Sequence, residues 1–412
     1  MSRILGVSGK CILRGGLALA MLVPLQSAYA GNSQTVLHAF TLGGDGGFPD
    51  SGLLADEQGN LYGTTEWGGD STNCQNGCGA VFKLAPDGTE SVLYSFCPVS
   101  KCADGEQPYA GLIEDKSGSL YGTTYLGGAD NFGTIFELAP DGTESVLYSF
   151  SGSSRDGANP LAGLIVDSAG NLYGTTAGGG HYNDNKCEPG GCGTVFELAP
   201  DGTETVLYRF TGGKDGGNPY AGLIMDKAGN LYGTTLFGGP GGSGVVFRLA
   251  PDGTETVLSH FKNGIDFDSP HASLIQDKAG NLYGTTFLGG GYGFGSVFKI
   301  TPKGRAIALH TFTGNDGRYP ESPLVVDEAG NLYGTTSEGG ADNSGTIFKL
   351  DPDGTESVLH SFCSQSNCTD GATPIAGLTK DKAGNLYGTT LDGGDAGCDS
   401  GEGCGTVFKL KK

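Results

Sequence analysis

"AGNLYGTT" occupies residues 169–176 and returns letter for letter at four further places, which begin at Ala228, Ala279, Ala329 and Ala383. Near-copies at 58–65 ("QGNLYGTT") and 117–124 ("SGSLYGTT") bring the number of copies to seven. The glycines of consecutive "LYG" triplets lie between 50 and 59 residues apart along the chain. A repeat of this length is typical of propeller blades and other tandem architectures, so the octapeptide marks one structural unit.

Each unit contains four strand-like pieces. In the third unit they are "AGLIVD" (162–167), "NLYGTT" (171–176), "GTVFELAP" (193–200) and "ETVLYRF" (204–210). All four are short, rich in β-branched and aromatic residues, and bounded by Gly, Asp or Pro. No helical periodicity accompanies them. The sequence therefore predicts an all-β fold, a seven-bladed β-propeller with four antiparallel strands in each blade.

The two ends of the chain predict how the ring closes. A copy of the fourth strand, "TVLHAF" (35–40), precedes the first complete unit, and the last unit stops after "GTVFKL" (405–410) without a fourth strand of its own. We expect the N-terminal strand to complete the last blade. Such closure removes exposed sheet edges.

The first thirty residues have the pattern of a secretory signal peptide. Arg3, Lys10 and Arg14 precede the apolar run "GLALAMLVPL" (16–25), and "AYA" (28–30) offers a cleavage point. The run is short for a membrane span. We expect residues 1–30 to be removed and 31–412 to form a single propeller domain, secreted or periplasmic, without a membrane span. A retained amphipathic anchor is the alternative.

The mature chain is strongly acidic. The formal net charge is −21, and removal of the three cationic residues of the signal peptide, which holds no acidic residue, brings it to −24. A charge of this sign repels phosphate backbones and anionic lipid surfaces. We therefore expect no nucleic-acid partner.

Ten of the eleven cysteines lie outside the signal peptide and form five close pairs. An even number of paired cysteines in an exported chain is typical of disulfides. A zinc site also uses paired cysteines, but the flanks here are glycine- and asparagine-rich turns with no matching histidines. The predicted disulfides are Cys74–Cys78, Cys97–Cys102, Cys187–Cys192, Cys363–Cys368 and Cys398–Cys404.

The connections between strands are unequal. The first and third links of each unit are the tight "DxxGN" and "PDGT" turns, and the other two links are long and variable. Alternate links of an antiparallel sheet emerge on the same side, so all long loops share one face, and that face carries all five cysteine pairs. Variable loops on a rigid scaffold commonly form binding sites, with disulfides ordering them locally.

Two variable positions give candidate binding residues. Just before the first strand of each unit stand Asp50, Tyr109, Leu161, Tyr220, His271, Glu321 and Ile375, which we expect to ring the mouth of the central channel. Aromatic residues follow "YGTT" in four units. The candidates for a stacking platform that holds a sugar or peptide are Trp67, Tyr125, Phe237, Phe287, Tyr109 and Tyr220. Packing of these rings between blades is the alternative.

Evidence for catalysis is weaker, because one active site needs residues that break the repeat. His271, Glu321 and Asp266 are the candidates for an acid/base or metal cluster. No Ser or Cys nucleophile pattern accompanies them. Aspartates recur in the long loops and in both tight turns; we expect them to cap turns, with calcium bound by these loops as the alternative and no other cofactor.

The whole unit, "GLxxDxxGNLYGTTxxGG…GTVFxLxPDGTExVLYSF", resembles the GloVer (Gloeobacter/Verrucomicrobia-type) tandem repeat of exported bacterial proteins, over nearly all of the mature chain. Members often carry a C-terminal sorting anchor, which the ending "KLKK" does not lead us to expect. The resemblance implies no established activity.

The "DxxGNLY" turn is also similar, over a short stretch, to NHL and gluconolactonase-type propellers. We expect a monomeric exported binding or interaction module whose partner is an extracellular glycan or protein. An extracellular glycan hydrolase or lyase with an acid/base cluster at the channel mouth is the alternative, and a purely architectural envelope component is a third.

Overall fold

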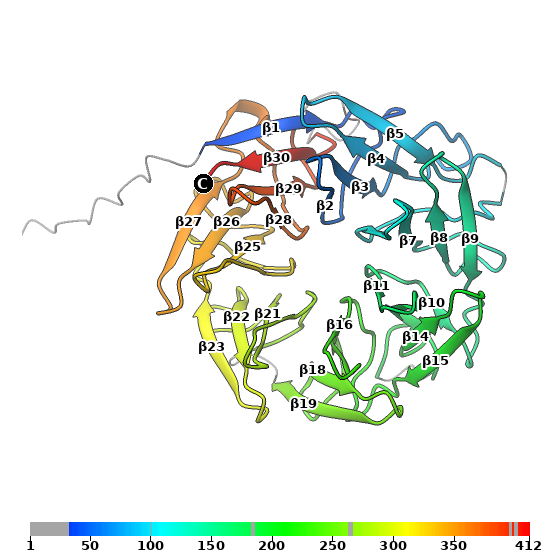
Figure 1. The fold of residues 1–412 in the computed structure, drawn as a ribbon. Coiled ribbons are helices and arrows are strands. Elements are labelled where there is room, and N and C mark those ends of the chain that lie inside the picture. The colour runs from blue at the N-terminus through cyan, green and yellow to red at the C-terminus, as the bar shows by residue number, and fades with distance from the viewer. Residues whose placement is uncertain (1–32, 100, 183–185, 263–266, 395–397, 399–402) are drawn as a thin grey trace, which may run out of the picture. The chain divides into compact units, whose positions relative to one another are not determined.

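The computed structural model describes residues 33–412 except 100, 183–185, 263–266, 395–397 and 399–402. The predicted signal peptide (1–30) and Asp266 therefore lie outside the described residues. Within the described part, seven antiparallel sheets of four strands each follow one another around a ring (Figure 1). This arrangement confirms the predicted seven-bladed β-propeller.

Six blades are built from consecutive segments of chain. The first blade consists of β2 (Leu54–Ala55), β3 (Leu61–Thr65), β4 (Ala80–Leu84) and β5 (Glu90–Ser95), and the second of β6 (Ile113–Glu114), β7 (Leu120–Thr124), β8 (Thr134–Leu138) and β9 (Glu144–Ser149). The third blade consists of β11 (Ile165–Val166), β12 (Leu172–Thr176), β14 (Thr194–Leu198) and β15 (Glu204–Arg209), and the fourth of β16 (Ile224–Met225), β17 (Leu231–Thr235), β18 (Gly242–Leu249) and β19 (Glu255–Lys262). The fifth blade consists of β20 (Ile275–Gln276), β21 (Leu282–Thr286), β22 (Ser296–Ile300) and β23 (Ala306–Thr311), and the sixth of β24 (Val325–Val326), β25 (Leu332–Thr336), β26 (Thr346–Leu350) and β27 (Glu356–Ser361).

The seventh blade joins the two ends of the chain. Its strands are β28 (Thr379–Lys380), β29 (Leu386–Thr390), β30 (Thr406–Leu410) and the N-terminal β1 (Gln34–Ala39). Gln34 pairs with Leu410 and Ala39 pairs with Thr406, so that β1 lies antiparallel to β30. The predicted closure is confirmed, and every blade has its four strands.

The "LYGTT" stretch is the second strand of each blade, and its side chains have fixed partners. In the first blade Asp56 accepts hydrogen bonds from the backbone N–H of Asn60 at 2.8 Å and from the Tyr62 hydroxyl at 3.1 Å. Burial alone would raise the pKa of Asp56, but these hydrogen bonds outweigh it and hold the pKa below its usual value. The Thr64 hydroxyl donates to the carbonyl of Ala110 in the next blade at 3.0 Å. The octapeptide therefore fixes both the turn and the contact between blades.

Phenylalanines fill the space between neighbouring blades. The Phe82 ring lies over Gly63 of "LYG", where an added Cβ would stand only 2.7 Å from the Phe82 ring. A glycine at this position is what allows the ring to lie flat against the second strand. At each of the seven boundaries between blades, two phenylalanine rings meet edge to face: Phe40–Phe82, Phe96–Phe136, Phe150–Phe196, Phe210–Phe247, Phe261–Phe298, Phe312–Phe348 and Phe362–Phe408.

The first strands are shorter than the sequence predicts. We expected one over 162–167, whereas β11 covers only Ile165–Val166. The carbonyl of Ala162 instead accepts a hydrogen bond from the Thr123 hydroxyl of the preceding blade at 3.3 Å. The beginning of each first strand is thus used for contact between blades near the axis.

Regular structure outside the blades is small. A two-stranded ladder joins β10 (Gly157–Ala158) to β13 (Gly178–Gly179). Among the described residues the only helix is a single 3₁₀ turn, η1 (Ser366–Cys368). No helix in that part of the chain is long and apolar enough to cross a membrane.

Candidate binding site at the axial cavity

Disulfides close the long loops where the sequence predicts them. All five predicted cysteine pairs are joined: Cys74–Cys78, Cys97–Cys102, Cys187–Cys192, Cys363–Cys368 and Cys398–Cys404. Each links residues only four to six positions apart. The staples therefore order single loops and do not tie one blade to another.

The recurring aspartates of the long loops accept hydrogen bonds from their own loops. Asp45 accepts from the backbone N–H and hydroxyl of Thr41 at 3.0 and 2.6 Å. Asp104 accepts from the backbone N–H of Cys97 at 2.8 Å and from the Tyr94 hydroxyl at 3.0 Å. In the "PDG" turns the carboxylate accepts from the N–H two residues on, as Asp87 does from Thr89 at 2.9 Å. These bonds give the aspartates a turn-capping role.

A cavity of about 360 Å³ lies where the first strands of the seven blades converge, and we call it the axial cavity. Its lining includes one variable, half-buried residue from each blade: Asp50, Tyr109, Leu161, Tyr220, His271, Glu321 and Ile375. These are the seven residues that the sequence predicts around the channel mouth. Neighbouring backbones lie close here, since a Cβ added to Gly111 would stand 3.1 Å from the carbonyl oxygen of Gly52.

Three acidic side chains that interact electrostatically, which we call the carboxyl trio, are Asp50, Glu66 and Glu321. Asp50 and Glu321 line the axial cavity. Burial, together with the charges of Glu66 and Glu321, raises the pKa of Asp50 to about 8. Burial also raises the pKa of Glu66, although hydrogen bonds from Tyr109 and Trp67 partly offset it. The Tyr109 hydroxyl donates to Glu66 Oε1 at 2.5 Å. Asp50 is therefore protonated at neutral pH and can donate a hydrogen bond.

Four rings in mutual contact, which we call the aromatic arc, are Tyr220, His271, Phe287 and Tyr319. Tyr220 and His271 line the axial cavity. The His271 ring stacks on Phe287 with centroids 5.0 Å apart, and Phe287 stacks on Tyr319 at 4.9 Å. Tyr220 meets His271 edge to face at 6.0 Å. Burial lowers the pKa of His271 to about 4, so that its imidazole is neutral at pH 7. The arc is an uncharged, partly exposed stacking surface.

The candidate catalytic residues are only partly brought together. His271 and Glu321 both line the axial cavity, but within the described residues no hydrogen bond or ion pair joins them. Burial raises the pKa of Glu321, with a hydrogen bond from Ser337 opposing the rise. Asp50 and Glu66, which the sequence placed only as variable positions, interact electrostatically with each other, and Asp50 also interacts with Glu321.

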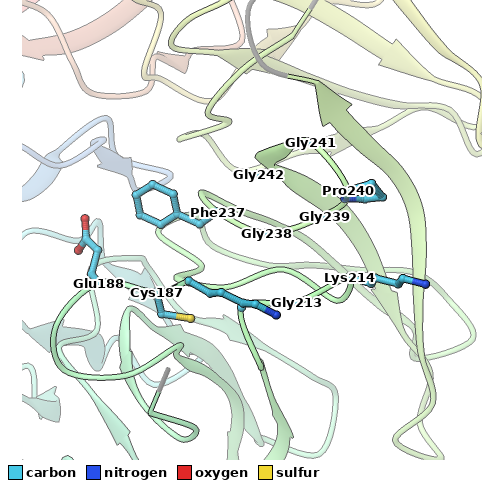
Figure 2. Close-up of a pocket in the computed structure, with 12 residues that line it drawn as sticks. Cys187, Glu188, Gly213, Lys214, Phe237, Gly238, Gly239, Pro240, Gly241 and Gly242 are labelled. Atoms are coloured by element: carbon cyan, nitrogen blue, oxygen red, sulfur yellow. The ribbon is translucent and has the colours of Figure 1, made fainter. Parts of the chain in front are cut away.

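Phe237 belongs to a second cavity of about 680 Å³ between the long loops of the third and fourth blades. Figure 2 shows its ring beside the glycine-rich turn 238–242 and near Glu188, with Lys214 directed to the opposite side. Glu188 accepts a hydrogen bond from the Tyr220 hydroxyl of the aromatic arc. The two cavities therefore share a wall.

The six predicted binding residues thus fall into three groups. Tyr109 and Tyr125 meet edge to face at 5.5 Å beside the carboxyl trio, where Trp67 also contacts Glu66. Tyr220 and Phe287 belong to the aromatic arc, and Phe237 lies in the second cavity. Tyr319 was missed because it stands one residue before the proline that marks the predicted ring; Arg318 packs its guanidinium over Tyr319 at 5.5 Å.

The Gloeobacter/Verrucomicrobia repeat model matches residues 25–188 and 185–408, which is nearly the whole described chain. The chain belongs to this repeat family. Its seven "LYGTT" strands are therefore the part that the copies of this Gloeobacter/Verrucomicrobia repeat share. A search of curated proteins finds no match to the sequence.

Solved propellers resemble the fold. The extracellular domain of a protein assigned as a hybrid two-component system from B. thetaiotaomicron superposes with a TM-score of 0.59 at 13% identity, over 91% of this chain and 39% of that one. A protein assigned as a 6-phosphogluconolactonase from Bacteroides uniformis gives 0.52 at 17% identity, over 80% and 88%. A puromycin hydrolase gives 0.54 at 13% identity, over 84% and 50%. At these identities the likeness concerns the fold alone.

Proposed function

We propose that the chain is an exported binding module that holds an extracellular glycan at the rim of the axial cavity. The observation that carries this proposal is that one cavity is lined by Tyr220 and His271 of the aromatic arc and by Asp50 and Glu321 of the carboxyl trio. Sugar rings present apolar C–H faces that pack on aromatic rings, and hydroxyls that exchange hydrogen bonds with carboxyl groups.

Export is supported by independent features. The N-terminal thirty residues have the composition of a signal peptide, and five disulfides suit an oxidising compartment. One of the similar solved propellers is itself an extracellular domain. The alternative ligand at the same rim is a protein. An array that contains both glycans and peptides distinguishes the two kinds of ligand.

The test is a glycan and peptide array probed with the purified mature chain, followed by affinity measurements on two matched variants. Phe287→Leu removes a ring from the aromatic arc, and leucine already stands at the equivalent place in the fourth blade (Leu236). We expect it to weaken glycan binding roughly tenfold, the equivalent of a lost stacking contact. Phe237→Leu, in the second cavity, should leave the affinity unchanged. Absence of any bound glycan, or equal losses in both variants, contradicts the proposal.

A second candidate function, a glycan hydrolase or lyase, is favoured by one observation. Asp50, with a pKa raised to about 8, interacts electrostatically with Glu66 and Glu321, and glycoside hydrolysis uses a pair of carboxyl groups of which the general acid has a raised pKa. An enzyme should release reducing ends from the glycan that it binds, and Asp50→Asn should abolish release while binding persists. A binding module releases none.

A further inference from the structure

A tyrosine or histidine near the end of the fourth strand meets two carboxyl groups at the boundary with the next blade. Between the first and second blades the Tyr94 hydroxyl lies 3.0 Å from Asp104 Oδ2 and 3.5 Å from Glu144 Oε2. The aspartate comes from the long loop after β5, and the glutamate opens β9. The tyrosine hydroxyl bridges the two blades.

Histidine replaces tyrosine between the fifth and sixth blades, where β23 and β27 are neighbours in the ring (Figure 1). His310 Nε2 lies 2.9 Å from Asp316 Oδ2. One nitrogen of His310 and one carboxylate oxygen each of Asp316 and Glu356 all lie within 4.8 Å of one another. We call these three residues the histidine triad. None of the three lines either cavity.

The triad is held in place and largely shielded. The side chains of His310 and Asp316 are only 17% and 16% exposed. Thr313 donates its backbone N–H and its hydroxyl to Asp316 Oδ1, both at 2.8 Å, which turns Oδ2 toward the histidine. The His310 ring packs edge to face on Phe312 at 4.9 Å. Glu356 Oε1 is buried and has no hydrogen-bond partner among the described residues, and the same is true of the equivalent oxygens of Glu144, Glu204 and Glu255 at other blade boundaries.

We propose that the histidine triad binds a divalent transition-metal ion of the Zn²⁺ class and so links the fifth blade to the sixth. An imidazole nitrogen with two carboxylates is a donor set that Zn²⁺ accepts, with remaining coordination positions left to solvent. The ion neutralises two crowded carboxylates. A tyrosine at the same place offers no such donor at neutral pH, because its hydroxyl keeps its proton.

The other blade boundaries provide internal comparisons. Where the seventh blade meets the first, His38 Nε2 lies 3.5 Å from Asp45 Oδ2, and neither His38 Nε2 nor Glu90 Oε1 has a hydrogen-bond partner within the described chain. We expect a weaker copy of the site there because the groups lie farther apart. Where the sixth blade meets the seventh, the fourth strand of the seventh blade, β1, begins with Gln34, at the position that Glu356 holds in the sixth blade. The Gln34 side chain donates a hydrogen bond to the backbone carbonyl of Asp370. That boundary lacks the second carboxylate.

The experiment is a calorimetric titration of Zn²⁺ into the purified mature chain after removal of metals with EDTA, with the disulfides verified by mass. We expect the wild type to bind Zn²⁺ and to unfold at a higher temperature with the ion than without it. His310→Tyr should lose one tight equivalent and most of the thermal shift. This variant keeps the fold because tyrosine stands at the same place in the first three blades. Glu356→Gln should weaken the tight site at least about tenfold.

Two controls make the result decisive. His181→Tyr alters an exposed loop histidine and should titrate like the wild type. Co²⁺ should give a visible d–d absorption in the wild type that His310→Tyr loses, which a mere ion pair between His310 and Asp316 does not produce. The proposal is overturned if the wild type binds no Zn²⁺ or if His310→Tyr binds the same number of ions. It is also overturned if Ca²⁺ stabilises both proteins equally and Zn²⁺ does no more, because the carboxylates alone then suffice.

Discussion

Phe40 and Phe82 meet edge to face across the point where the ring closes, with centroids 5.2 Å apart and planes at 69°. Phe40 follows the N-terminal strand β1, which belongs to the last blade, and Phe82 lies in β4 of the first. Both side chains are fully buried. The contact that joins consecutive blades elsewhere thus also joins the two ends of the chain.

Phe82→Ala should destabilise the protein by about 3–5 kcal/mol, because it opens a cavity at the closing boundary that its neighbours cannot fill. Urea unfolding gives the free energy of unfolding. Tyr292→Ala removes a ring that is 66% exposed and should cost little. A loss below roughly 1 kcal/mol for Phe82→Ala would show that the ring tolerates an open boundary.

Gly63→Ala should destabilise the protein by about 1–3 kcal/mol, because the new Cβ would lie 2.7 Å from the Phe82 ring. Combining it with Phe82→Leu tests the cause. If the collision with the ring is responsible, the double variant loses less free energy than the sum of the two single variants. Strict additivity would assign the loss to the backbone of the strand.

Stability should fall as the pH rises from 5 to 8. Burial, followed by the charge of the neighbouring aspartate, raises the pKa of four boundary glutamates to about 7: Glu144, Glu204, Glu255 and Glu356. A carboxyl group whose pKa is higher in the folded state binds protons more tightly there. Its contribution is present below the unfolded pKa and is lost as the pH passes the folded pKa. Urea midpoints at the two pH values measure the difference.

The matched variants locate this pH effect. Glu144→Gln should reduce the difference between the urea midpoints at pH 5 and pH 8, because the amide cannot ionise. Glu57→Gln, at an exposed position, should leave the difference as it is in the wild type. An unchanged difference in Glu144→Gln would move the origin of the effect away from the blade boundaries.

Asp50→Leu should raise the stability, and by more at pH 8 than at pH 5. The wild-type carboxyl group, whose pKa burial and the nearby carboxylates raise to about 8, opposes folding increasingly as the pH rises toward that value. Leucine is compatible with the site, since Leu161 occupies the same place in the third blade. Thermal unfolding of both proteins at the two pH values checks this. A gain that does not depend on pH would point to packing and not to charge.

Replacing Cys187 and Cys192 by serine should cost only about 2 kcal/mol, because the disulfide closes a loop of just five residues. The loss should therefore be smaller than that of Phe82→Ala in the same urea assay. Glycan binding at the aromatic arc is a second readout, since Glu188 of this loop accepts a hydrogen bond from Tyr220. If the variant were globally unfolded, the disulfides of the long loops would be required for the fold.

Much of the architecture follows from the sequence alone. Strand positions, turn residues and the closing role of residues 35–40 depend on short-range patterns. The chain repeats these patterns in seven copies, so comparison with the other copies corrects a wrong prediction for any one of them. The turn-capping role of Asp56 could be expected because its partners, Asn60 and Tyr62, lie four and six residues away. The length of the first strands was predicted wrongly, because contacts between blades make these strands shorter than the sequence pattern.

Only the tertiary structure decided which unrepeated side chains meet. Asp50 and Glu321 lie in different blades, yet the charge of one raises the pKa of the other. His310 and Glu356 likewise come from separate repeats, and their separation gives no sign that they share a buried site. The repeat specifies where the scaffold places each variable position. Distances, burial and charge around those positions depend on how seven blades pack around one axis, which no single copy of the repeat encodes.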